Sequence, residues 1–184
     1  GAGKSTIIDL ILGLHINYSG DIFIDDLKLK HSLSSWYSIL GYVPQSIYLL
    51  DDSIINNIAF GIDNQSIDNK KIDEVIKLAQ LEDFIKSLPN GLNTYVGENG
   101  VRISAGQKQR IGIARALYTD PKIVILDEAT SSLDHETEKD FINSIVKINK
   151  NKKLTIIIIA HKLNTIKICD SLLLINEGKL MDQD

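Results

Sequence analysis

The sequence predicts an α/β fold in which helices cover a mostly parallel sheet. Two apolar runs, "KIVILDEA" and "LTIIIIAH", lack the alternation of a half-exposed strand, and such runs are typical of parallel strands buried on both faces. The segment between them, "DHETEKDFINSIVKI", places Phe141, Ile142, Ile145 and Val146 at helical spacing. A strand, a helix and a second strand in this order imply a right-handed crossover within one sheet.

The other segments complete this fold. Thr6–Leu14 has the composition of an apolar helix, "GDIFIDDLKL" is strand-like with a turn at Asp25–Asp26, and "LGYVPQ" predicts a short strand that ends at Pro44. The stretch from Asp52 to Leu117 is mainly helical in pattern. "DSLLLINEGKL" predicts a further buried strand with a turn at Glu177–Gly178.

Length and composition fit one domain and exclude several classes of protein. The chain has 184 residues, 43% of them apolar, and a net charge of −4, which does not suit a nucleic-acid partner. The single Cys169 excludes an internal disulfide and suits a reducing compartment. The apolar runs are strand-sized, shorter than the ~20 residues of a membrane helix. We expect residues 1–50 and 119–184 to form an α/β core around an inserted helical subdomain, residues 51–118.

The first six residues, "GAGKST", resemble a phosphate-binding loop that leads into a helix. Backbone N–H groups of a glycine-rich turn at a helix N-terminus attract phosphate oxygens. Lys4 adds a positive charge for the β- and γ-phosphates, and Ser5 offers a hydroxyl to Mg²⁺. Taken alone, the stretch is also compatible with a helix start that carries a lysine by chance, because the full pattern needs a glycine five residues before Gly3.

Two acids, Asp127 and Glu128, follow a predicted buried strand. Ligands of open α/β sheets bind at the carboxyl ends of the strands. An Asp there can hold Mg²⁺ through water, and the neighbouring Glu can polarise a water for attack on a γ-phosphate. The alternative is an acidic pair that ends a strand at the surface.

The segment "ISAGQKQRIGIARAL" predicts a helix with a capping box, because Gln107 stands three residues after Ser104. Capping alone accounts for both side chains. A functional interpretation adds that a helix N-terminus with a serine hydroxyl and the bare Gly106 can approach a phosphate closely.

These segments together resemble the nucleotide-binding domain of an ABC transporter, a P-loop NTPase, along nearly the whole chain. "GAGKST" is similar to the Walker A motif, "VPQ" to the Q-loop and "ISAGQ" to the family signature, usually written LSGGQ. "IVILDE" resembles Walker B, "SSLD" the D-loop and "IIIAH" the H-loop. All six occur in the family's order. Ala105 replaces the first signature glycine, and we expect it to be tolerated because the first helical residue has ordinary helical φ.

The resemblance implies a role for each matching residue. Gln45 would sense Mg²⁺ and the attacking water, Glu128 would be the general base, and His161 would contact the γ-phosphate. Mg²⁺ would be held by Ser5, Gln45 and, through water, Asp127. Asp134 would bridge two subunits, while the signature residues would complete the partner's site. The ATP-contacting set would be Gly1, Ala2, Gly3, Lys4, Ser5, Thr6, Ser104, Gly106, Gln107 and Asp134.

Two segments, "DDSIINNIAFG" and "TYVGENGVRISAGQKQR", resemble exporters in particular, and Glu98 lies where exporters carry an acidic residue that touches the membrane domain. The resemblance implies an ATPase that dimerises, as a homo- or heterodimer, to power export or flipping of a substrate. We expect the chain to be a fragment, inactive by itself, whose parent polypeptide carries a transmembrane domain and lies at the cytoplasmic face of the inner membrane.

Two alternatives remain at this point. One is a stand-alone ATPase subunit that serves a separate permease. The other is a soluble ABC ATPase that acts on DNA or ribosomes. The second is less favoured, because neither a long coiled-coil insertion nor a basic arm is visible in the sequence.

Overall fold

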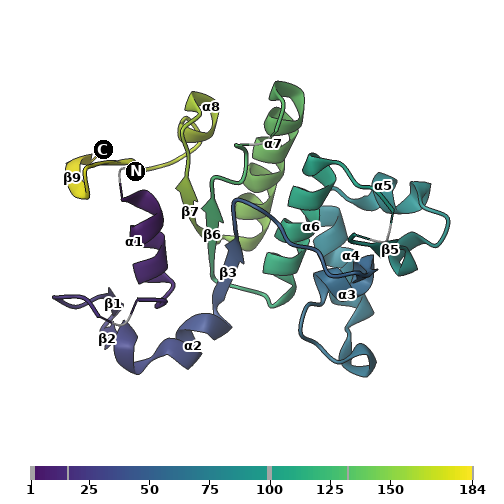
Figure 1. Cartoon of the computed structure of the whole chain (residues 1–184), viewed down its shortest axis with the longest axis horizontal. Helices are drawn as coiled ribbons and strands as arrows, with labels where there is room; N and C mark the ends of the chain where they lie inside the picture. Colours follow the sequence, from purple (N-terminus) through teal and green to yellow (C-terminus); the bar gives the residue numbers. More distant parts are fainter. Residues whose placement is uncertain (1–2, 16, 99–100, 132, 184) are drawn as a thin grey trace.

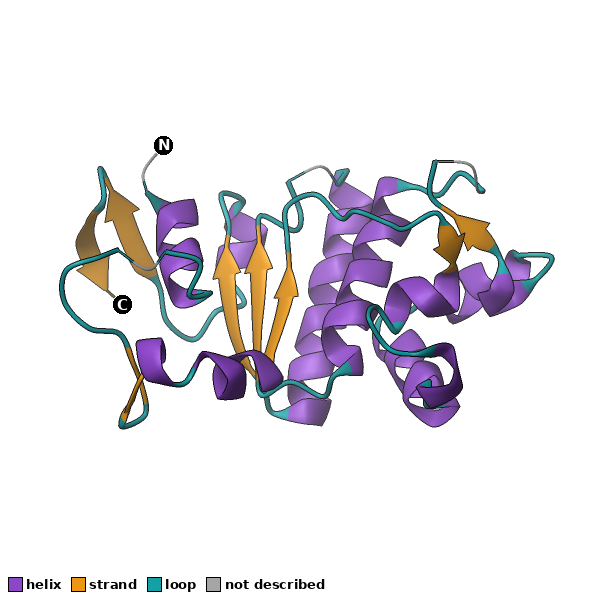
Figure 2. Ribbon diagram, turned by 60° about the horizontal axis from the view of Figure 1, so that its bottom comes forward, coloured by secondary structure: helices purple, strands orange, loops and turns teal. Residues whose placement is uncertain are grey.

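The computed structural model describes residues 3–15, 17–98, 101–131 and 133–183. At its centre is a three-stranded parallel sheet in the order β3 (Leu40–Val43), β6 (Ile123–Asp127) and β7 (Thr155–Ile159). Figure 2 shows the three strands side by side with their arrows pointing the same way. The predicted α/β fold with a parallel sheet is thus confirmed.

Helices cover both faces of this sheet (Figure 1). Along β6, Val124 and Leu126 join the larger apolar cluster, which includes residues of α6 (Ala105–Tyr118) and α7 (His135–Lys152). Ile125 points to the other face and packs with Ile8 of α1 (Lys4–Ile11). Alternating residues of one strand therefore serve two different cores, which explains why the strand sequence is apolar at every position.

Short elements surround this centre. Before β3 come β1 (Phe23–Ile24), β2 (Leu27–Lys28), η1 (Leu29–His31) and α2 (Leu33–Ser38). Between β3 and α6 come β4 (Asp52–Ser53), α3 (Ile54–Ile58), η2 (Asn64–Ser66), α4 (Asn69–Leu78), α5 (Glu82–Ser87), η3 (Gly91–Asn93) and β5 (Tyr95–Val96). After β7 come α8 (Leu163–Ile166), β8 (Leu173–Asn176) and β9 (Lys179–Gln183). The turn expected at Asp25–Asp26 joins β1 to β2.

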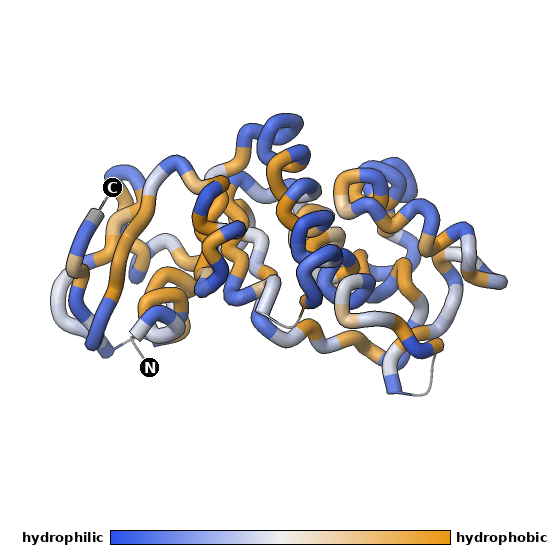
Figure 3. The backbone as a smooth tube through the Cα atoms, turned by 90° about the horizontal axis from the view of Figure 1, so that it is seen from above, coloured by the Kyte–Doolittle hydropathy of each residue, from blue (hydrophilic) through white to orange (hydrophobic). Residues whose placement is uncertain are grey.

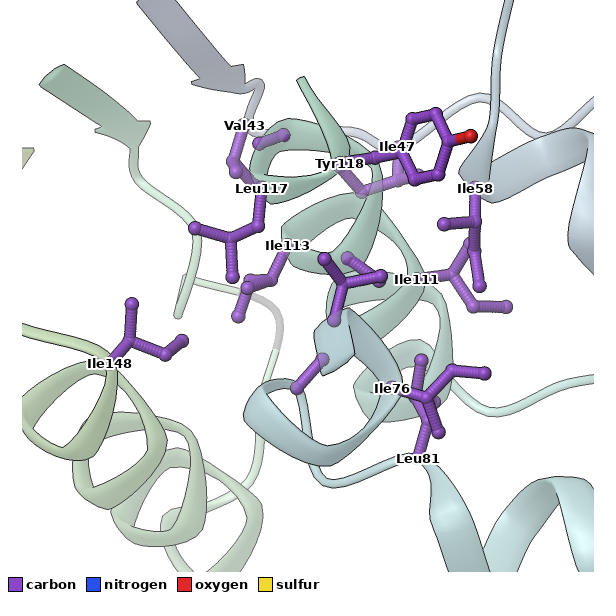
Figure 4. Packing of buried hydrophobic residues seen from close by; sticks show 14 of the residues in the cluster. Val43, Ile47, Ile58, Ile76, Leu81, Ile111, Ile113, Leu117, Tyr118 and Ile148 are labelled. Atoms are coloured by element: carbon purple, nitrogen blue, oxygen red, sulfur yellow. The ribbon is translucent and has the colours of Figure 1, made fainter. Parts of the chain in front are cut away.

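Helix α6 lies between the sheet and the other helices. Its Ile113 and Leu117 face β3 and α7, whereas Ile111 packs with residues of α3 and α4 such as Ile58 and Ile76, as Figure 4 shows. Nine of its fourteen residues are buried, so one helix contributes to both halves of the core. In the stretch predicted to be helical, α3, α4, α5 and α6 are accompanied by the small β4–β5 ribbon.

The prediction of a covered strand at the C-terminal end is wrong for the described residues. β8 pairs only with β9, in an antiparallel hairpin whose turn is the expected Glu177–Gly178. Leu173 and Leu174 are 56% and 55% exposed, and Figure 3 shows apolar positions in this hairpin beside the N-terminal helix. A cavity of about 730 Å³ separates β7 and α1 from Leu173, so among the described residues β8 has no sheet to join.

The contact between β3 and α6 predicts the effect of a small substitution. A Cβ atom at the buried Gly41 would lie 2.7 Å from the carbonyl oxygen of Ala116 and 3.2 Å from Cγ of Pro121. Gly41→Ala must therefore push strand and helix apart, and we expect a loss of about 1–3 kcal/mol in the free energy of unfolding. Denaturant unfolding measures it, with the exposed Ser34→Ala as control. Equal stability of Gly41→Ala and the control would contradict this packing.

Candidate functional site

Two side chains flank one carboxylate at the carboxyl edge of the sheet, and a third reaches one of these two. Nε2 of His161 lies 2.7 Å from Oε1 of Glu128, and the Gln45 amide donates to Oε2 of Glu128 at 2.9 Å. Nζ of Lys4 lies 2.9 Å from Nε2 and 3.1 Å from Nδ1 of His161. Four residues that are far apart in the sequence thus meet in one cluster.

The parallel register brings these residues together. Gln45 follows the end of β3 by two residues, Glu128 directly follows β6, and His161 follows β7 by two residues. The Glu128 N–H continues the ladder beyond the strand, donating to the Ile159 carbonyl at 3.1 Å. Lys4 is the first residue of α1, which packs against the same sheet. The carboxyl ends of parallel strands share one edge, which is where ligands of such folds bind.

The backbone at Glu128 is in the left-handed region, with φ of +47°. This conformation is uncommon for a residue with a Cβ and is found disproportionately at functional sites. It turns the chain sharply after β6 and directs the carboxylate toward Gln45 and His161, with its side chain 23% exposed.

Asp127 is held in a different environment. The Tyr42 hydroxyl donates to its Oδ2 atom at 3.3 Å. Burial raises the pKa of the Asp127 carboxyl, the Tyr42 hydrogen bond opposes this rise, and the charges of Glu128 and Asp9 add to it. Burial and the Asp127 charge raise the pKa of Tyr42 to about 12, so at neutral pH the phenol keeps the proton that it donates. Within the described residues, no lysine or arginine forms an ion pair with Asp127.

These donors suit Mg²⁺. Mg²⁺ is bound by one or two carboxylates together with water and phosphate oxygens, not by an all-protein cage. Among the described residues, no group of three or more His, Cys, Asp or Glu side chains is arranged to hold a metal ion by itself. Asp127 supplies a carboxylate whose charge lacks a protein counter-ion, and Ser5 supplies an exposed hydroxyl in the first turn of α1. Gln45 would add an amide oxygen.

At the start of α1, Gly3 has φ of +88° and precedes Lys4, Ser5 and Thr6 in the first turn. A glycine is suited to this conformation, since residues with a Cβ are strained there. The predicted ATP contacts of Gly1 and Ala2 fall on residues outside those that the structure describes.

The signature residues lie at the start of α6. Ser104 accepts from the Gln107 N–H at 3.2 Å and its own N–H donates to Oε1 of Gln107 at 2.8 Å, so the predicted capping box is confirmed. Ala105 is the first helical residue, as expected. A Cβ at Gly106 would lie 2.6 Å from Cγ2 of Thr137, so the beginnings of α6 and α7 are in close contact.

Asp134 caps α7. Its carboxylate accepts from the backbone N–H groups of Glu136 and Thr137, and from the Thr137 hydroxyl at 2.7 Å. Hydrogen bonds from Thr137, then from Glu136, lower the pKa of Asp134. The side chain is exposed beside the Gly106 contact.

The candidate residues therefore form two groups. One group consists of Lys4, Gln45, Asp127, Glu128 and His161 around the sheet edge. The other, made of Ser104, Gly106, Gln107 and Asp134, lies at the starts of α6 and α7. Both Figure 1 and Figure 2 place α1 on the β7 side of the sheet and α6 beyond β3. The resemblance implies that the signature residues complete the partner's site, and within one chain they lie apart from the group at the sheet edge.

Sequence reasoning also missed Tyr42 and Lys162. The Lys162 ammonium donates to the carbonyls of Thr130 and Leu133 at 2.9 and 3.0 Å and forms an ion pair with the buried Glu138 at 3.3 Å. It thereby joins the segment after His161 to the one that precedes Asp134. One sequence signal could have indicated the Lys162 contact: a charged residue, Glu138, stands at an inward-facing position of the amphipathic helix and so needs a partner of opposite charge.

Comparison with known proteins fits this geometry. The sequence profile described as "ABC transporter" matches residues 1–131. The chain belongs to the ABC transporter family. A solved structure of a bacterial Atm1-family ABC exporter with ATP bound superimposes with a TM-score of 0.87 at 39% identity, over 99% of this chain and 31% of that one. The fold is therefore that of an ABC ATPase domain.

Several curated proteins are similar over the whole chain. The ATP-dependent lipid A-core flippase 2 of Colwellia psychrerythraea is 42% identical over 184 residues, which is 100% of this chain and 31% of that protein. The ATP-dependent lipid A-core flippase of Wigglesworthia glossinidia brevipalpis is 45% identical, over 99% of this chain and 31% of that protein. ABC transporter B family member 21 of Arabidopsis thaliana is 40% identical, over 100% of this chain and 14% of that protein. The chain thus spans under a third of the length of these relatives. In its described part, no helix combines the length and apolar composition that a membrane crossing demands.

The opposite environments of two aspartates predict opposite effects on stability. Because the pKa of Asp127 is raised, its ionised form is less favourable in the folded protein, and stability falls as pH rises through the raised value. Asp127→Asn should therefore raise the melting temperature at pH 7 in the absence of nucleotide. Because the pKa of Asp134 is lowered, its ionised form is stabilising above the ordinary carboxyl pKa, and that stability is lost as pH falls.

Asp134→Asn is thus the matched control, and it should lower the melting temperature at pH 7. Thermal unfolding of both variants at pH 7 and pH 4 measures the difference, which should shrink at the lower pH. A less stable Asp127→Asn protein at pH 7 would show that burial does not penalise this carboxylate.

Proposed function

We propose that this chain binds ATP with Mg²⁺ and hydrolyses it to power export or flipping of a substrate across a membrane. The observation that carries the proposal is the position of Glu128, with Gln45 on one side, His161 on the other and Lys4 beyond the histidine. This is the constellation that positions a water molecule for attack on a terminal phosphate, since phosphoryl transfer depends mainly on positioning and on electrostatic stabilisation.

Each side chain has a distinct task in this mechanism. Lys4 and the N-terminus of α1 bind the phosphates, because both offer positive charge and donors. Asp127 through water, Ser5 and Gln45 would hold Mg²⁺, which would supply positive charge next to the phosphate oxygens. Glu128 accepts a proton from the attacking water, while the Gln45 amide and His161 fix the orientation of its two oxygens.

The signature group serves the site of a second ABC ATPase domain. Ser104, Gly106 and Gln107 present a helix N-terminus that is exposed at Ser104 and lies across the sheet from Lys4 in the same chain. In a head-to-tail pair of domains, each α6 can face the phosphate site of its partner. Asp134 lies beside this helix start, where it would contact both subunits.

The coupled activity is export by a membrane protein. The first relatives are flippases in which the matching region is 31% of the length, which supports a transmembrane domain on the same polypeptide. We propose that the ATPase domain of this polypeptide lies at the cytoplasmic face of the inner membrane. A plant B-family transporter is about as similar as the flippases. We infer that this domain is a motor whose sequence does not specify the cargo. The share of each relative that it covers disfavours a stand-alone subunit.

The general base is tested by Glu128→Gln. The substitution keeps the side chain's shape but removes its ability to take a proton, so we expect normal ATP affinity and a turnover that is lower by about 10²–10⁴-fold. Steady-state hydrolysis and nucleotide binding in the full-length protein measure the two effects. The exposed Glu136→Gln, in the first turn of α7, is the control and should keep its activity. Near-normal turnover of Glu128→Gln would remove this residue from the mechanism.

The trans arrangement is tested by a mixed dimer of one Ser104→Ala chain and one Lys4→Ala chain. If signatures act on the partner's site, one composite site carries both lesions and the other carries none, and activity should clearly exceed that of either mutant homodimer. If signatures act within their own chain, both sites carry one lesion and both fail.

Wild-type–Ser104→Ala and wild-type–Lys4→Ala dimers show what a single impaired site costs. If the Ser104→Ala homodimer keeps its activity and loses only about 1 kcal/mol of stability, the role of this serine is that of a helix cap.

A further inference from the structure

One face of α6 holds the segment 45–50, which connects β3 to the helical part of the chain. Gln109, Gly112 and Arg115 are spaced by three residues and so lie on the same face of the helix. The Gln109 amide donates to the Gln45 carbonyl at 3.1 Å. One turn further on, a Cβ at Gly112 would lie 2.5 Å from Cδ1 of Ile47, and Figure 4 shows Ile47 against this helix.

The far end of the segment is held in the same way. Arg115 donates to the Tyr48 carbonyl at 3.0 Å and to the Asn57 carbonyl at 2.8 Å. The fully buried Asn57 accepts from the Leu50 N–H at 2.8 Å and donates back to the Leu50 carbonyl at 3.1 Å. Among the described residues, no backbone–backbone hydrogen bond reaches residues 45–49. Side chains of α6 therefore replace the ladder that would otherwise fix this loop.

The residue that Gln109 contacts, Gln45, also contacts the proposed general base, Glu128. The Gln45 carbonyl accepts from Gln109, while the Gln45 side chain donates to Glu128 at 2.9 Å. The direction of the Gln45 side chain follows from its backbone position, which Gln109 sets. The same helix begins with Ser104, just over one turn before Gln109. A displacement of α6 is thus passed to Gln45 through a single residue.

The Gln109 side chain is poorly suited to a purely structural role. It is 3% exposed, and its Oε1 atom has no hydrogen-bond partner among the described residues. The amide orientation is unambiguous, because the Gln45 carbonyl can only accept. A buried oxygen without a partner lowers stability, so an apolar side chain of the same length should be tolerated at least as well by the fold.

We propose that Gln109 is a positioning residue that ties the orientation of Gln45, and through it Glu128, to the position of helix α6. The inference rests on the proposed function of Glu128. It predicts that Gln109 affects the rate of hydrolysis without touching nucleotide, and that its effect requires the Gln45 side chain.

The test uses Gln109→Met in the full-length protein, because Met keeps the length and volume of the side chain and loses the donor. We expect kcat for ATP to fall about threefold to tenfold, the range of one hydrogen bond, with KM unchanged and a melting temperature equal to or above that of the parent. In a Gln45→Ala background, the same substitution should have no further effect. Because residues 45–49 lack backbone–backbone hydrogen bonds to the described residues, their mobility is better measured by proteolysis, and cleavage by chymotrypsin after the exposed Tyr48 should become faster in Gln109→Met.

The matched control is Tyr118→Phe, on the same helix. It removes the 2.9 Å hydrogen bond from the Asp68 N–H and is also buried, but among the described residues its hydroxyl has no hydrogen bond with residues 45–49. It should lower the melting temperature and leave kcat and the cleavage after Tyr48 unchanged. Unchanged kcat in Gln109→Met, or kcat losses that multiply with Gln45→Ala, would overturn the proposal. Cleavage after Tyr48 also separates two failures. An active Glu128→Gln protein would refute the catalytic role of Glu128, whereas the cleavage rate still reports whether Gln109 holds the segment 45–49.

Discussion

The parallel pairing of β6 with β3 on one side and β7 on the other is the constraint on which the site depends. The register pairs Val43 with Leu126 and Asp127 with Ile159, so the three strands end within one residue of the same level. Gln45, Glu128 and His161 each follow within two residues of a strand end. A shift of one residue in either pairing would turn every side chain of a strand from one apolar cluster to the other. Packing of the two cores therefore enforces the register that the site requires.

Helix α6 gives the site its second constraint. Its apolar residues pack on β3 and α7 on one side and on α3 and α4 on the other, and the helix is buried along most of its length. Ser104 at its first turn and Gln109 in its second cannot move independently, because a helix this well packed moves as a body. The segment 45–50 lacks backbone hydrogen bonds between residues 45 and 49, and it is attached to that body by side chains alone. Helix α6 thus connects Ser104 at its start with the segment that follows β3 at the sheet edge.

Features that depend on residues close together in the sequence could be predicted, whereas features that depend on distant neighbours could not. Elements defined by local patterns were predictable: the strand at 123–127, the helix of α7, the turn at Asp25–Asp26 and the capping box at Ser104. The C-terminal hairpin shows the limit, because burial of a strand depends on its neighbours, and β8 has the apolar run of a covered strand without a covering layer among the described residues.

The residues of the candidate site were selected by motif spacing, but their geometry could not be predicted in this way. The left-handed backbone of Glu128 leaves no trace in composition, since the conformation is imposed by the strand end and the bond to Ile159. Tyr42 was hidden for a different reason. It occupies an ordinary strand position in "LGYVPQ", and its role exists only because β3 lies beside β6 and brings its hydroxyl to Asp127.

Three local departures from stability lie within this one site. Asp127 is a partly buried carboxylate with no ion-pair partner among the described residues, Glu128 has φ of +47°, and Gln109 leaves a buried oxygen unpaired. Such costs persist when the surroundings determine the conformation, and they concentrate where a protein must bind charge or move protons. In the proposed complex with ATP and Mg²⁺ the same three features would become favourable. A cation would relieve the charge of Asp127, the turn at Glu128 would place a base beside the phosphate site, and the donor of Gln109 would fix the residue that orients this base. The large apolar core around α6 is what allows the fold to tolerate all three.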